Sequence, residues 1–325
     1  MPDSGLIVSL LGGLVIMAFA GDFLVNGAVA CSRRLGLSPL IAGIFIVGFG
    51  TSAPEMLVAL DAARNNYPNL ALGNIVGSNI ANILLVLALP AIISPIVTGG
   101  WGQGRSFIAM LLITLAWIAI LGTVGLDVAV GTLFLIALVL YAVFTLVSAR
   151  MATKAGVDTG IDVEPDKLGT GRAAGYVLIG MIGLPIGAHL IVEGGVGIAR
   201  FYSIREELIG LTLLAVGTSL PEIGAGIAAA VRNKTDVLVG NVLGSNIFNI
   251  LGAGGFIAFF GPIDAAQSFF NYDHWVMAAA ALIVGLFIFA KMRIGRLAGL
   301  LLLLIYAVYI YGLVNGWNIS ALLNV

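Results

Sequence analysis

The sequence predicts an all-α membrane protein with ten transmembrane helices, arranged as two inverted five-helix repeats. Three observations carry this prediction: an apolar composition, an internal duplication and the placement of basic residues. Of the 325 residues, 60% are hydrophobic and only 10% are charged, and the mean hydropathy is +1.11. A soluble chain of this length would not be so poor in charge, so most of the chain is expected to lie in a lipid bilayer.

Ten apolar segments are long enough to cross a hydrocarbon core, which takes about 20 residues per helix. The first segment is too long for a removable signal peptide and lacks a small-residue cleavage pattern, so it is kept as part of the fold. The expected spans are 5–31, 38–64, 69–95, 106–124, 126–149, 173–199, 207–231, 236–262, 274–290 and 297–315.

Two pairs of motifs reveal an internal duplication. The hexapeptides are GTSAPE (Gly50–Glu55) and GTSLPE (Gly217–Glu222), and the decapeptides are GNIVGSNIAN (Gly73–Asn82) and GNVLGSNIFN (Gly240–Asn249). One offset aligns both pairs, since 222 minus 55 and 249 minus 82 both give 167, and the ungapped windows 43–82 and 210–249 agree at 16 of 40 positions. Five spans per copy is an odd number, so the second copy enters the membrane in the opposite direction. Inverted repeats are typical of secondary transporters, which bind their cargo where the repeats meet.

The basic residues agree with ten spans. With both termini outside, twelve Lys and Arg residues fall in inner loops and three in outer loops, as the positive-inside rule requires. The expected division is residues 1–149 for the first repeat, 150–172 for a short cytoplasmic linker and 173–325 for the second repeat. The inner residues are Arg33, Arg34, Arg105, Arg150, Lys154, Lys167, Arg172, Arg232, Lys234, Lys291, Arg293 and Arg296.

Composition also argues against several classes of function. The formal net charge of −1 and the lack of a basic cluster argue against a nucleic-acid partner. A single cysteine, Cys31, excludes an intrachain disulfide. Neither a nucleophile–base set nor a nucleotide motif indicates an enzyme. We therefore expect no cofactor and no obligate protein partner, with the bilayer as the surrounding medium.

Each hexapeptide places a proline inside a predicted helix. Pro54 has no N–H and its ring clashes with the carbonyl of Gly50, and Pro221 does the same to Gly217. Carbonyls just before each proline are thereby freed from helix bonding, which at membrane depth is tolerated only where they line a cavity or meet a partner. A hydroxyl also shares a helical face with a carboxylate or an amide four residues later, so four helices each offer an oxygen-bearing face. These pairs are Thr51 with Glu55, Thr218 with Glu222, Ser78 with Asn82 and Ser245 with Asn249.

Glu55 and Glu222 are the carboxylates of the two hexapeptides. A carboxylate at the bilayer centre costs roughly 2.5–3.5 kcal/mol on insertion scales, so two of them need a cationic partner. Oxygen ligands without His or Cys suit Ca²⁺, which takes about 6–8 oxygens, better than zinc or copper. Mg²⁺ loses water reluctantly and fits a dehydrated site less well. Two ionised glutamates balance the charge of one Ca²⁺.

Structural roles are the alternatives for these motifs. Ser52 with Glu55, and Ser219 with Glu222, also fit a capping box at a helix start, although capping does not require two matching copies. The GxxxG-like glycines of the decapeptides are assigned to helix packing. Asp22 aligns with His189 in the other repeat. For Asp22, a place near an ion path and a local hydrogen-bond role fit equally well.

The motif pairs resemble the two alpha-repeats of the cation/calcium exchanger superfamily, in particular its sodium/calcium exchanger branch. The resemblance covers nearly the whole chain, and the short central loop is similar to that of prokaryotic members. It implies a multi-pass protein of the cell (inner) membrane, an antiporter that exchanges Na⁺ for Ca²⁺ by alternating access. Family members commonly exchange three Na⁺ for one Ca²⁺, so the exchange is expected to be electrogenic.

The resemblance also implies the site residues. Glu55 and Glu222, with backbone oxygens of Thr51 and Thr218, would hold Ca²⁺, and Asn82 and Asn249 would line the central position. Na⁺ would use the same glutamates, the hydroxyls of Thr51, Ser52, Ser78, Thr218, Ser219 and Ser245, and the carbonyls of Gly48 and Ala215. Some relatives, including the potassium-coupled branch, have Asp where this chain has Asn249. We therefore expect exchange that does not depend on K⁺.

Two rival functions remain. A proton/calcium antiporter of the same fold usually carries Gly-Asn-Ala in place of Gly-Thr-Ser, so both hexapeptides favour sodium, although a buried glutamate can also exchange a proton. A cation channel needs sites weak enough for steady conduction and no compulsory alternation. Inverted repeats with helices interrupted by proline favour a carrier over a channel.

Overall fold

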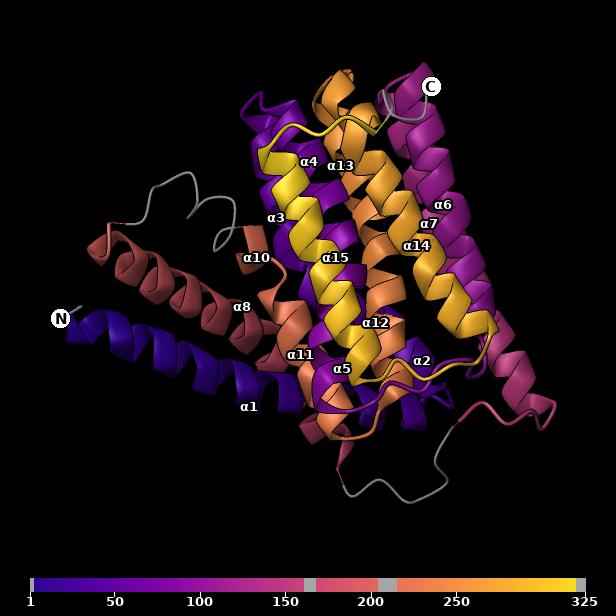
Figure 1. Ribbon diagram of the computed structural model, residues 1–325. Coiled ribbons are helices and arrows are strands. Elements are labelled where there is room, and N and C mark those ends of the chain that lie inside the picture. Colours follow the sequence, from indigo (N-terminus) through magenta and orange to yellow (C-terminus); the bar gives the residue numbers. More distant parts are fainter. Residues whose placement is uncertain (1–2, 161–167, 204–214, 320–325) are drawn as a thin grey trace.

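The computed structural model describes residues 3–160, 168–203 and 215–319, and these residues form helices joined by short loops (Figure 1). The helices before residue 160 are α1 (Ser4–Arg34), α2 (Pro39–Ala42), η1 (Gly43–Gly48), α3 (Phe49–Arg64), α4 (Pro68–Ala81), η2 (Asn82–Val86), α5 (Ala88–Ile93), α6 (Gln103–Thr123) and α7 (Val128–Lys154). Those after residue 168 are α8 (Thr170–Phe201), α10 (Ala215–Gly217), α11 (Leu220–Val231), α12 (Thr235–Ile247), η4 (Phe248–Ala253), α13 (Gly254–Ile257), η5 (Ala258–Phe260), η6 (Phe269–Asp273), α14 (His274–Phe289) and α15 (Arg296–Val314).

The predicted all-α membrane fold is confirmed. Within the described residues, nine helical runs are long and apolar enough to cross a membrane. The shorter apolar helix α11 belongs to the expected span 207–231, of which residues 207–214 lie outside the described residues. The expected separation of the fourth and fifth spans is also found, because Asp127 begins α7 by accepting a 2.8 Å hydrogen bond from the Val130 N–H.

The offset of 167 extends from the motifs to the helix bounds. Adding 167 to the bounds of α1 gives 171 and 201, and α8 is Thr170–Phe201. Adding 167 to the bounds of α4 gives 235 and 248, and α12 is Thr235–Ile247. The π-helices η2 and η4, which follow α4 and α12, correspond in the same way. Helices α1 to α7 therefore form the first repeat and α8 to α15 the second.

Two isolated backbone bridges show that the repeats are inverted. Ile96 pairs with Ile294, and Leu126 pairs with Ile263, so each bridge joins one repeat to the other. Because Ile96 and Ile294 lie on the same face, the chain crosses the membrane an even number of times between them. Helices α6, α7 and α8, the run from α12 to η5, and α14 provide five crossings. The connection from α8 to α12 must therefore also change faces, and α11 is its described helix.

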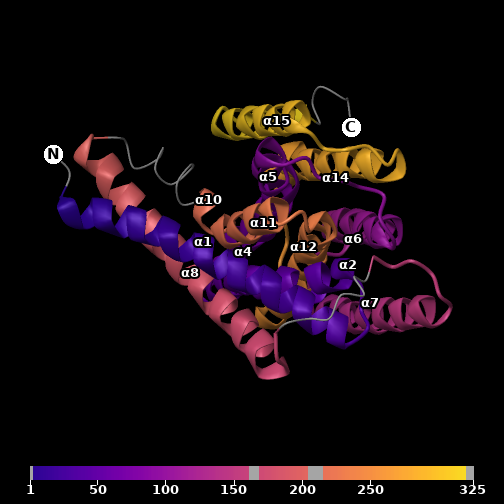
Figure 2. The ribbon, with the colours of Figure 1, turned by 90° about the horizontal axis from the view of Figure 1, so that it is seen from below.

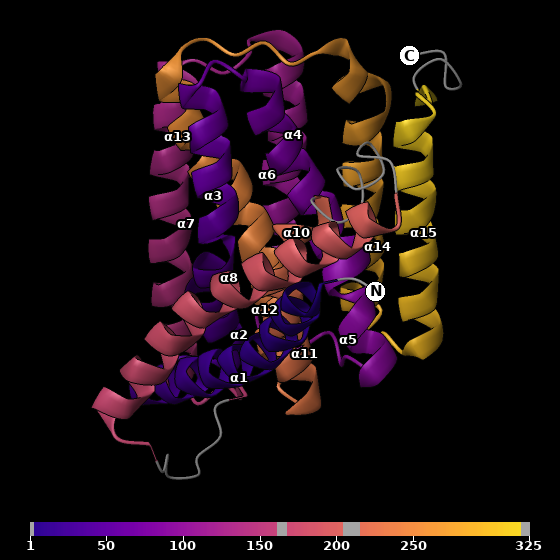
Figure 3. The same cartoon turned by 90° about the vertical axis from the view of Figure 1, so that its left-hand side faces the viewer.

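The two decapeptide helices occupy the centre of the molecule. Most other helices stand upright around them, whereas α1 and α8 lie side by side and cross the flank obliquely (Figures 1 and 2). Figure 3 shows this oblique pair from its own side. In an apolar 18-residue stretch of the span Pro68–Ile93, which contains α4, 83% of the residues are buried. The value for the span Thr235–Phe260, which contains α12, is 89%, and no other described span reaches either value. Helices without a lipid-facing side place their polar residues in the protein interior.

Glycines bring the backbones of the two repeats into contact at this centre. A Cβ on Gly244 would lie 2.7 Å from the carbonyl oxygen of Ile44, and a Cβ on Gly240 would collide with the carbonyl of Leu40. The predicted packing role is thus confirmed for these two decapeptide glycines, because only a missing side chain permits such an approach.

Candidate cation-binding site

The two hexapeptides adopt different local structures. In the second copy the helix is interrupted at Thr218 and Ser219, between α10 and α11, as the proline predicts. In the first copy α3 continues through Pro54, and the expected interruption there is wrong. A π-helix, η1, lies directly before α3 instead. The carbonyl of Gly48, the last residue of this wider turn, lies within reach of the Thr51 and Ser245 hydroxyls.

Glu55 and Glu222 are buried and close together. Glu55 is 1% exposed and Glu222 is 0% exposed, and their carboxyl groups lie within interaction range of each other. Ser52 Oγ donates a 3.1 Å hydrogen bond to Glu222 Oε1. The Oε2 atom of each glutamate has no hydrogen-bond partner among the described residues. Two such carboxylates require positive charge nearby.

Neutral oxygens from both repeats surround the first hexapeptide. The Thr51 hydroxyl lies 3.0 Å from the Val47 carbonyl, 3.4 Å from the Gly48 carbonyl and 3.2 Å from Asn241 Oδ1. The Ser245 hydroxyl lies 3.3 Å from the same Gly48 carbonyl. A hydroxyl has one proton and two lone pairs, so these groups retain acceptor capacity. The described residues contain no group of three or more His, Cys, Asp or Glu that could hold a metal. A cation here would therefore combine the two carboxylates with neutral oxygens.

The central asparagines lie in the first turn of the two π-helices. Asn82 opens η2 and is 1% exposed, and Asn249 lies in η4 and is also 1% exposed. Asn82 Nδ2 donates a 3.0 Å hydrogen bond to Asn246 Oδ1, which leaves Asn82 Oδ1 without a partner in the described part of the chain. Both amide atoms of Asn249 likewise have none. Free amide oxygens are suitable ligands for a hard cation.

Most of the predicted site residues are buried, but direct contacts join only some of them. Contacts join Ser52 to Glu222, and both Thr51 and Ser245 to Gly48, while Thr218 is only half-buried. Ala215 opens α10, but its side chain lies outside the described part of the structure. The predicted residues that are buried are Gly48, Thr51, Ser52, Glu55, Ser78, Asn82, Ser219, Glu222, Ser245 and Asn249.

Four further asparagines of the decapeptides contribute contacts that the sequence analysis missed. Asn74 Nδ2 donates a 2.9 Å hydrogen bond to the backbone oxygen of Glu55, and its equivalent Asn241 contacts Thr51. Asn79 and its equivalent Asn246 are buried beside the central asparagines. The sequence does indicate these four asparagines, because they too repeat at the offset of 167. They were missed because oxygen-bearing residues spaced four apart mark only one face of each helix, and these asparagines lie on other faces.

The capping-box alternative is wrong. Ser52 lies inside α3 and donates to Glu222 in the other repeat. Ser219 does precede α11, but its side chain caps no backbone N–H of the described helix. For Asp22 the structure favours the local role, because it accepts a 3.1 Å hydrogen bond from Asn26 and forms an ion pair with Arg232.

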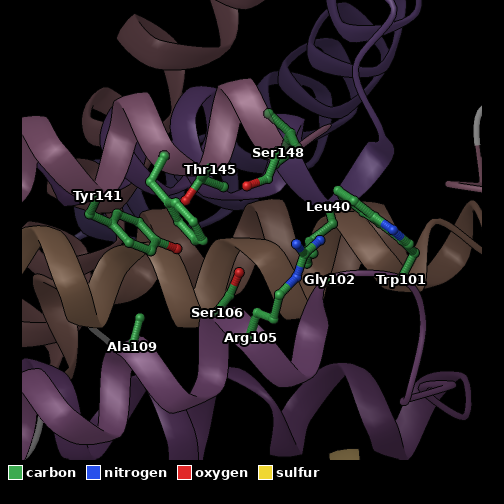
Figure 4. Close-up of a pocket in the computed structure, with 11 residues that line it drawn as sticks. Leu40, Trp101, Gly102, Arg105, Ser106, Ala109, Tyr141, Thr145 and Ser148 are labelled. Atoms are coloured by element: carbon green, nitrogen blue, oxygen red, sulfur yellow. The ribbon is translucent and has the colours of Figure 1, made fainter. Parts of the chain in front are cut away.

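A separate cavity of about 50 Å³ lies between α2, α6 and α7 (Figure 4). At the edge of this cavity, the guanidinium of Arg105 lies over the Trp101 ring, 4.7 Å from the ring centroid. The hydroxyls of Ser106 and Thr145 also line the cavity. None of the predicted cation ligands lines this cavity. The case for a cation site therefore rests on the charge and oxygen content of the packed centre, and not on an open pocket.

Comparison with known proteins agrees with this chemistry. A family model described as "Sodium/calcium exchanger protein" matches residues 5–147 and 172–315. The sodium/calcium exchanger MaX1 of Methanosarcina acetivorans is 28% identical over 93% of this chain and 96% of its own length. The inner membrane protein YrbG of Escherichia coli is 33% identical over 90% of this chain and 92% of its own.

The fold also matches a solved exchanger. A structure of the sodium-calcium exchanger NCX_Mj, soaked with zero Na⁺ and Ca²⁺, superimposes with a TM-score of 0.80 at 33% identity. The match covers 95% of this chain and 99% of that one. The family model spans both repeats. The relatives that align over most of this chain and the solved structure agree with it. This chain belongs to the sodium/calcium exchanger family.

Proposed function

We propose that this protein is a secondary antiporter that exchanges Na⁺ for Ca²⁺ at one shared site centred on Glu55 and Glu222. The observation that carries the proposal is the pair of buried carboxylates, one from each repeat, whose Oε2 atoms have no partner among the described residues. A site between inverted repeats is where alternating access exposes the cargo to either face.

Charge accounts for obligate exchange. Two glutamates carry two negative charges, which one Ca²⁺ neutralises. An empty site leaves both charges buried and uncompensated, and such a state resists the change between faces. The carboxylates therefore cross only with Ca²⁺ or with Na⁺ bound, so the movement of one ion is coupled to the movement of the other.

Neutral oxygens complete the proposed ligand set. Ca²⁺ would take the carboxylates with backbone oxygens of Thr51 and Thr218. Na⁺ would take the carboxylates with the hydroxyls of the two hexapeptides and of Ser78 and Ser245, the carbonyls of Gly48 and Ala215, and the amide oxygens of the central asparagines. The contacts of the Thr51 and Ser245 hydroxyls with the Gly48 carbonyl, at 3.4 and 3.3 Å, support this grouping.

The same charge count gives the electrical behaviour. Three Na⁺ at two carboxylates leave one positive charge, whereas one Ca²⁺ leaves none, so three-for-one exchange moves net charge. Asn249 supplies an amide and no third carboxylate at the centre. We therefore propose electrogenic exchange that does not require K⁺.

Topology extends the proposal to the membrane. We place the loops after α1, α5, α7, α11 and α14 in the cytoplasm, because these loops carry most of the basic residues, and we place both termini outside. Residues 1–149 and 173–325 would then be the two moving halves, and 150–172 the cytoplasmic linker. The inner membrane of a prokaryotic cell is the proposed location.

The test is uptake of radiolabelled Ca²⁺ into proteoliposomes. Vesicles loaded with Na⁺ are compared with vesicles that carry only an outward proton gradient, each with and without K⁺. We expect uptake that requires internal Na⁺, is unchanged by K⁺ and is accelerated by an inside-positive potential, since each cycle removes one net positive charge from the lumen. Uptake driven by protons alone would identify a proton-coupled antiporter, and uptake without either gradient would identify a channel.

A further inference from the structure

The buried amides of the decapeptides form a hydrogen-bonded chain on one side of the centre. Asn246 Nδ2 donates to Met110 Sδ over 3.5 Å, and Asn82 Nδ2 donates to Asn246 Oδ1 over 3.0 Å. Met110 and Asn82 belong to the first repeat and Asn246 to the second. The chain therefore joins α6, α12 and η2 across the repeat boundary.

The offset of 167 predicts a mirror chain, and only half of it is made. At this offset Met110 is equivalent to Met277, Asn246 to Asn79 and Asn82 to Asn249. Asn79 Nδ2 does donate to Met277 Sδ, over 3.9 Å. However, Asn79 Oδ1 and Asn249 Nδ2, the acceptor and donor that would complete it, both lack a partner among the described residues.

The methionines determine which way the amides face. A thioether sulfur accepts and never donates a hydrogen bond, so an amide facing it presents its NH₂ group. Asn246 must then offer its oxygen to Asn82, and Asn82 must donate its own NH₂ group to that oxygen. The Asn82 amide oxygen is thereby left free, which is the orientation that a hard cation needs.

The mirror elements are already adjacent. The structure packs η2 against α12 and η4 against α4, so Asn249 lies on an element that contacts the helix of Asn79. Asn79 is 1% exposed and Asn249 is 1% exposed, and buried amide groups left unpaired are costly. The glutamates show the same one-sided pattern, because Ser52 bonds Glu222 whereas Ser219 Oγ and Glu55 Oε2 have no partner among the residues described.

We propose that Asn79 and Asn246 are positioning residues that orient the central asparagine of the opposite repeat in alternate states. When the repeats exchange conformations, the Asn82–Asn246 hydrogen bond is replaced by an Asn249–Asn79 hydrogen bond. Inverted repeats make this exchange the expected one, because a contact made in one facing state has its mirror contact in the other. This inference rests on the proposed alternating exchange. It assigns a role to two residues that are not themselves cation ligands.

The test uses mirror variants, Asn246→Leu and Asn79→Leu, which keep the branched shape of the side chain but remove its hydrogen bonds, including the bond to the central asparagine of the opposite repeat. Each variant disfavours the facing state that its own bond stabilises. The readout is the ratio of the apparent KM values for Ca²⁺ at the two faces, in proteoliposomes whose protein orientation has been determined by protease digestion. We expect the two variants to shift this ratio in opposite directions, each by about threefold to tenfold. The double variant should return toward the parent ratio.

Further variants separate this role from a purely structural one. Met110→Leu removes the sulfur that orients Asn246, so it should shift the ratio in the same direction as Asn246→Leu but by less. Should the leucine variants fold poorly, Asn246→Ser and Asn79→Ser make the same comparison with less disruption. Shifts in the same direction for both mirror variants, or none, would overturn the inference. Absence of sodium-driven uptake in the parent protein would instead overturn the proposed function.

Discussion

Ser52 in the first repeat donates a 3.1 Å hydrogen bond to Glu222 Oε1 in the second repeat. Both residues are fully buried, so the bond links the two hexapeptides inside the protein and not through solvent. It orients one of the two carboxylates directly. The mirror bond, from Ser219 to Glu55, is not made among the described residues. The two glutamates therefore have different surroundings in this conformation, although their motifs are nearly identical.

Replacing Ser52 should weaken ion binding. Ser52→Ala removes the hydroxyl that orients Glu222 and that we propose as a Na⁺ ligand. Loss of a hydrogen bond to a buried charged acceptor costs about 1–3 kcal/mol. We expect the Na⁺ dependence of Ca²⁺ exchange to shift to roughly tenfold higher concentration, measured as radiolabelled Ca²⁺ uptake at varied internal Na⁺.

A buried serine elsewhere provides the matched control for that variant. Ser32 is 1% exposed, and its hydroxyl bonds locally to the Val29 carbonyl over 3.0 Å in α1. Ser32→Ala should leave the Na⁺ dependence unchanged. An equal shift in both variants would mean that loss of any buried hydroxyl disturbs exchange, and Ser52 would lose its assigned role.

Neutralising either glutamate should abolish Ca²⁺ exchange. Glu55→Gln and Glu222→Gln, made separately, preserve shape but leave one negative charge where Ca²⁺ needs two. Removing one of two buried like charges also relieves repulsion, so each variant should be at least as stable as the parent when Ca²⁺ is absent. Ca²⁺ should raise the unfolding temperature of the parent and not that of the variants, because only a bound ligand stabilises the folded state.

Asp61 offers the control for charge alone. It is an exposed carboxylate near the end of α3, the helix that also carries Glu55. Asp61→Asn should retain both the exchange and the stabilisation by Ca²⁺. Retention of full exchange by Glu55→Gln or Glu222→Gln would disprove the shared carboxylate site.

The sequence predicts that the two repeats have the same helices, but it does not predict where their side-chain contacts differ. Identical residues at an offset of 167 suffice to predict the second repeat, and the bounds of α8 and α12 follow that offset. Asn82 and Asn249 are the same residue at equivalent positions. The side chain of Asn82 is hydrogen-bonded, whereas that of Asn249 has no partner among the described residues. That difference depends on how the repeats are tilted against each other, and residue types do not encode the tilt.

The sequence also does not predict the local backbone geometry of the two hexapeptides. Pro54 and Pro221 occupy equivalent positions, but the helix is interrupted only at the second. The first hexapeptide directly follows the π-helix η1, and α3 continues through Pro54. The placement of a π-turn depends on packing against neighbouring helices, here α12, and leaves no periodic signature.

The decapeptide glycines should be sensitive to a single methyl group where backbones touch. Gly244→Ala would place a Cβ 2.7 Å from the Ile44 carbonyl oxygen and 2.8 Å from its Cα, and backbone atoms cannot move aside as a side-chain end can. Overpacking of this kind costs about 1–3 kcal/mol. We expect a lower unfolding temperature in detergent. Gly12→Ala is the control, because a Cβ at this helical position in α1 meets nothing within 4 Å, and it should be neutral or slightly stabilising.

The ion pair between Asp22 and Arg232 should contribute little stability and no selectivity. The Arg232 side chain is 43% exposed and the Asp22 side chain is 38% exposed, so solvent screens the attraction. A double-mutant cycle of Asp22→Asn and Arg232→Gln should give a coupling of at most about 1 kcal/mol. High salt should reduce the coupling. Each variant should retain sodium-driven Ca²⁺ uptake, because the pair joins α1 to the end of α11, ten residues along the chain from Glu222. Loss of uptake in Asp22→Asn, with its fold intact, would instead place Asp22 on the ion path.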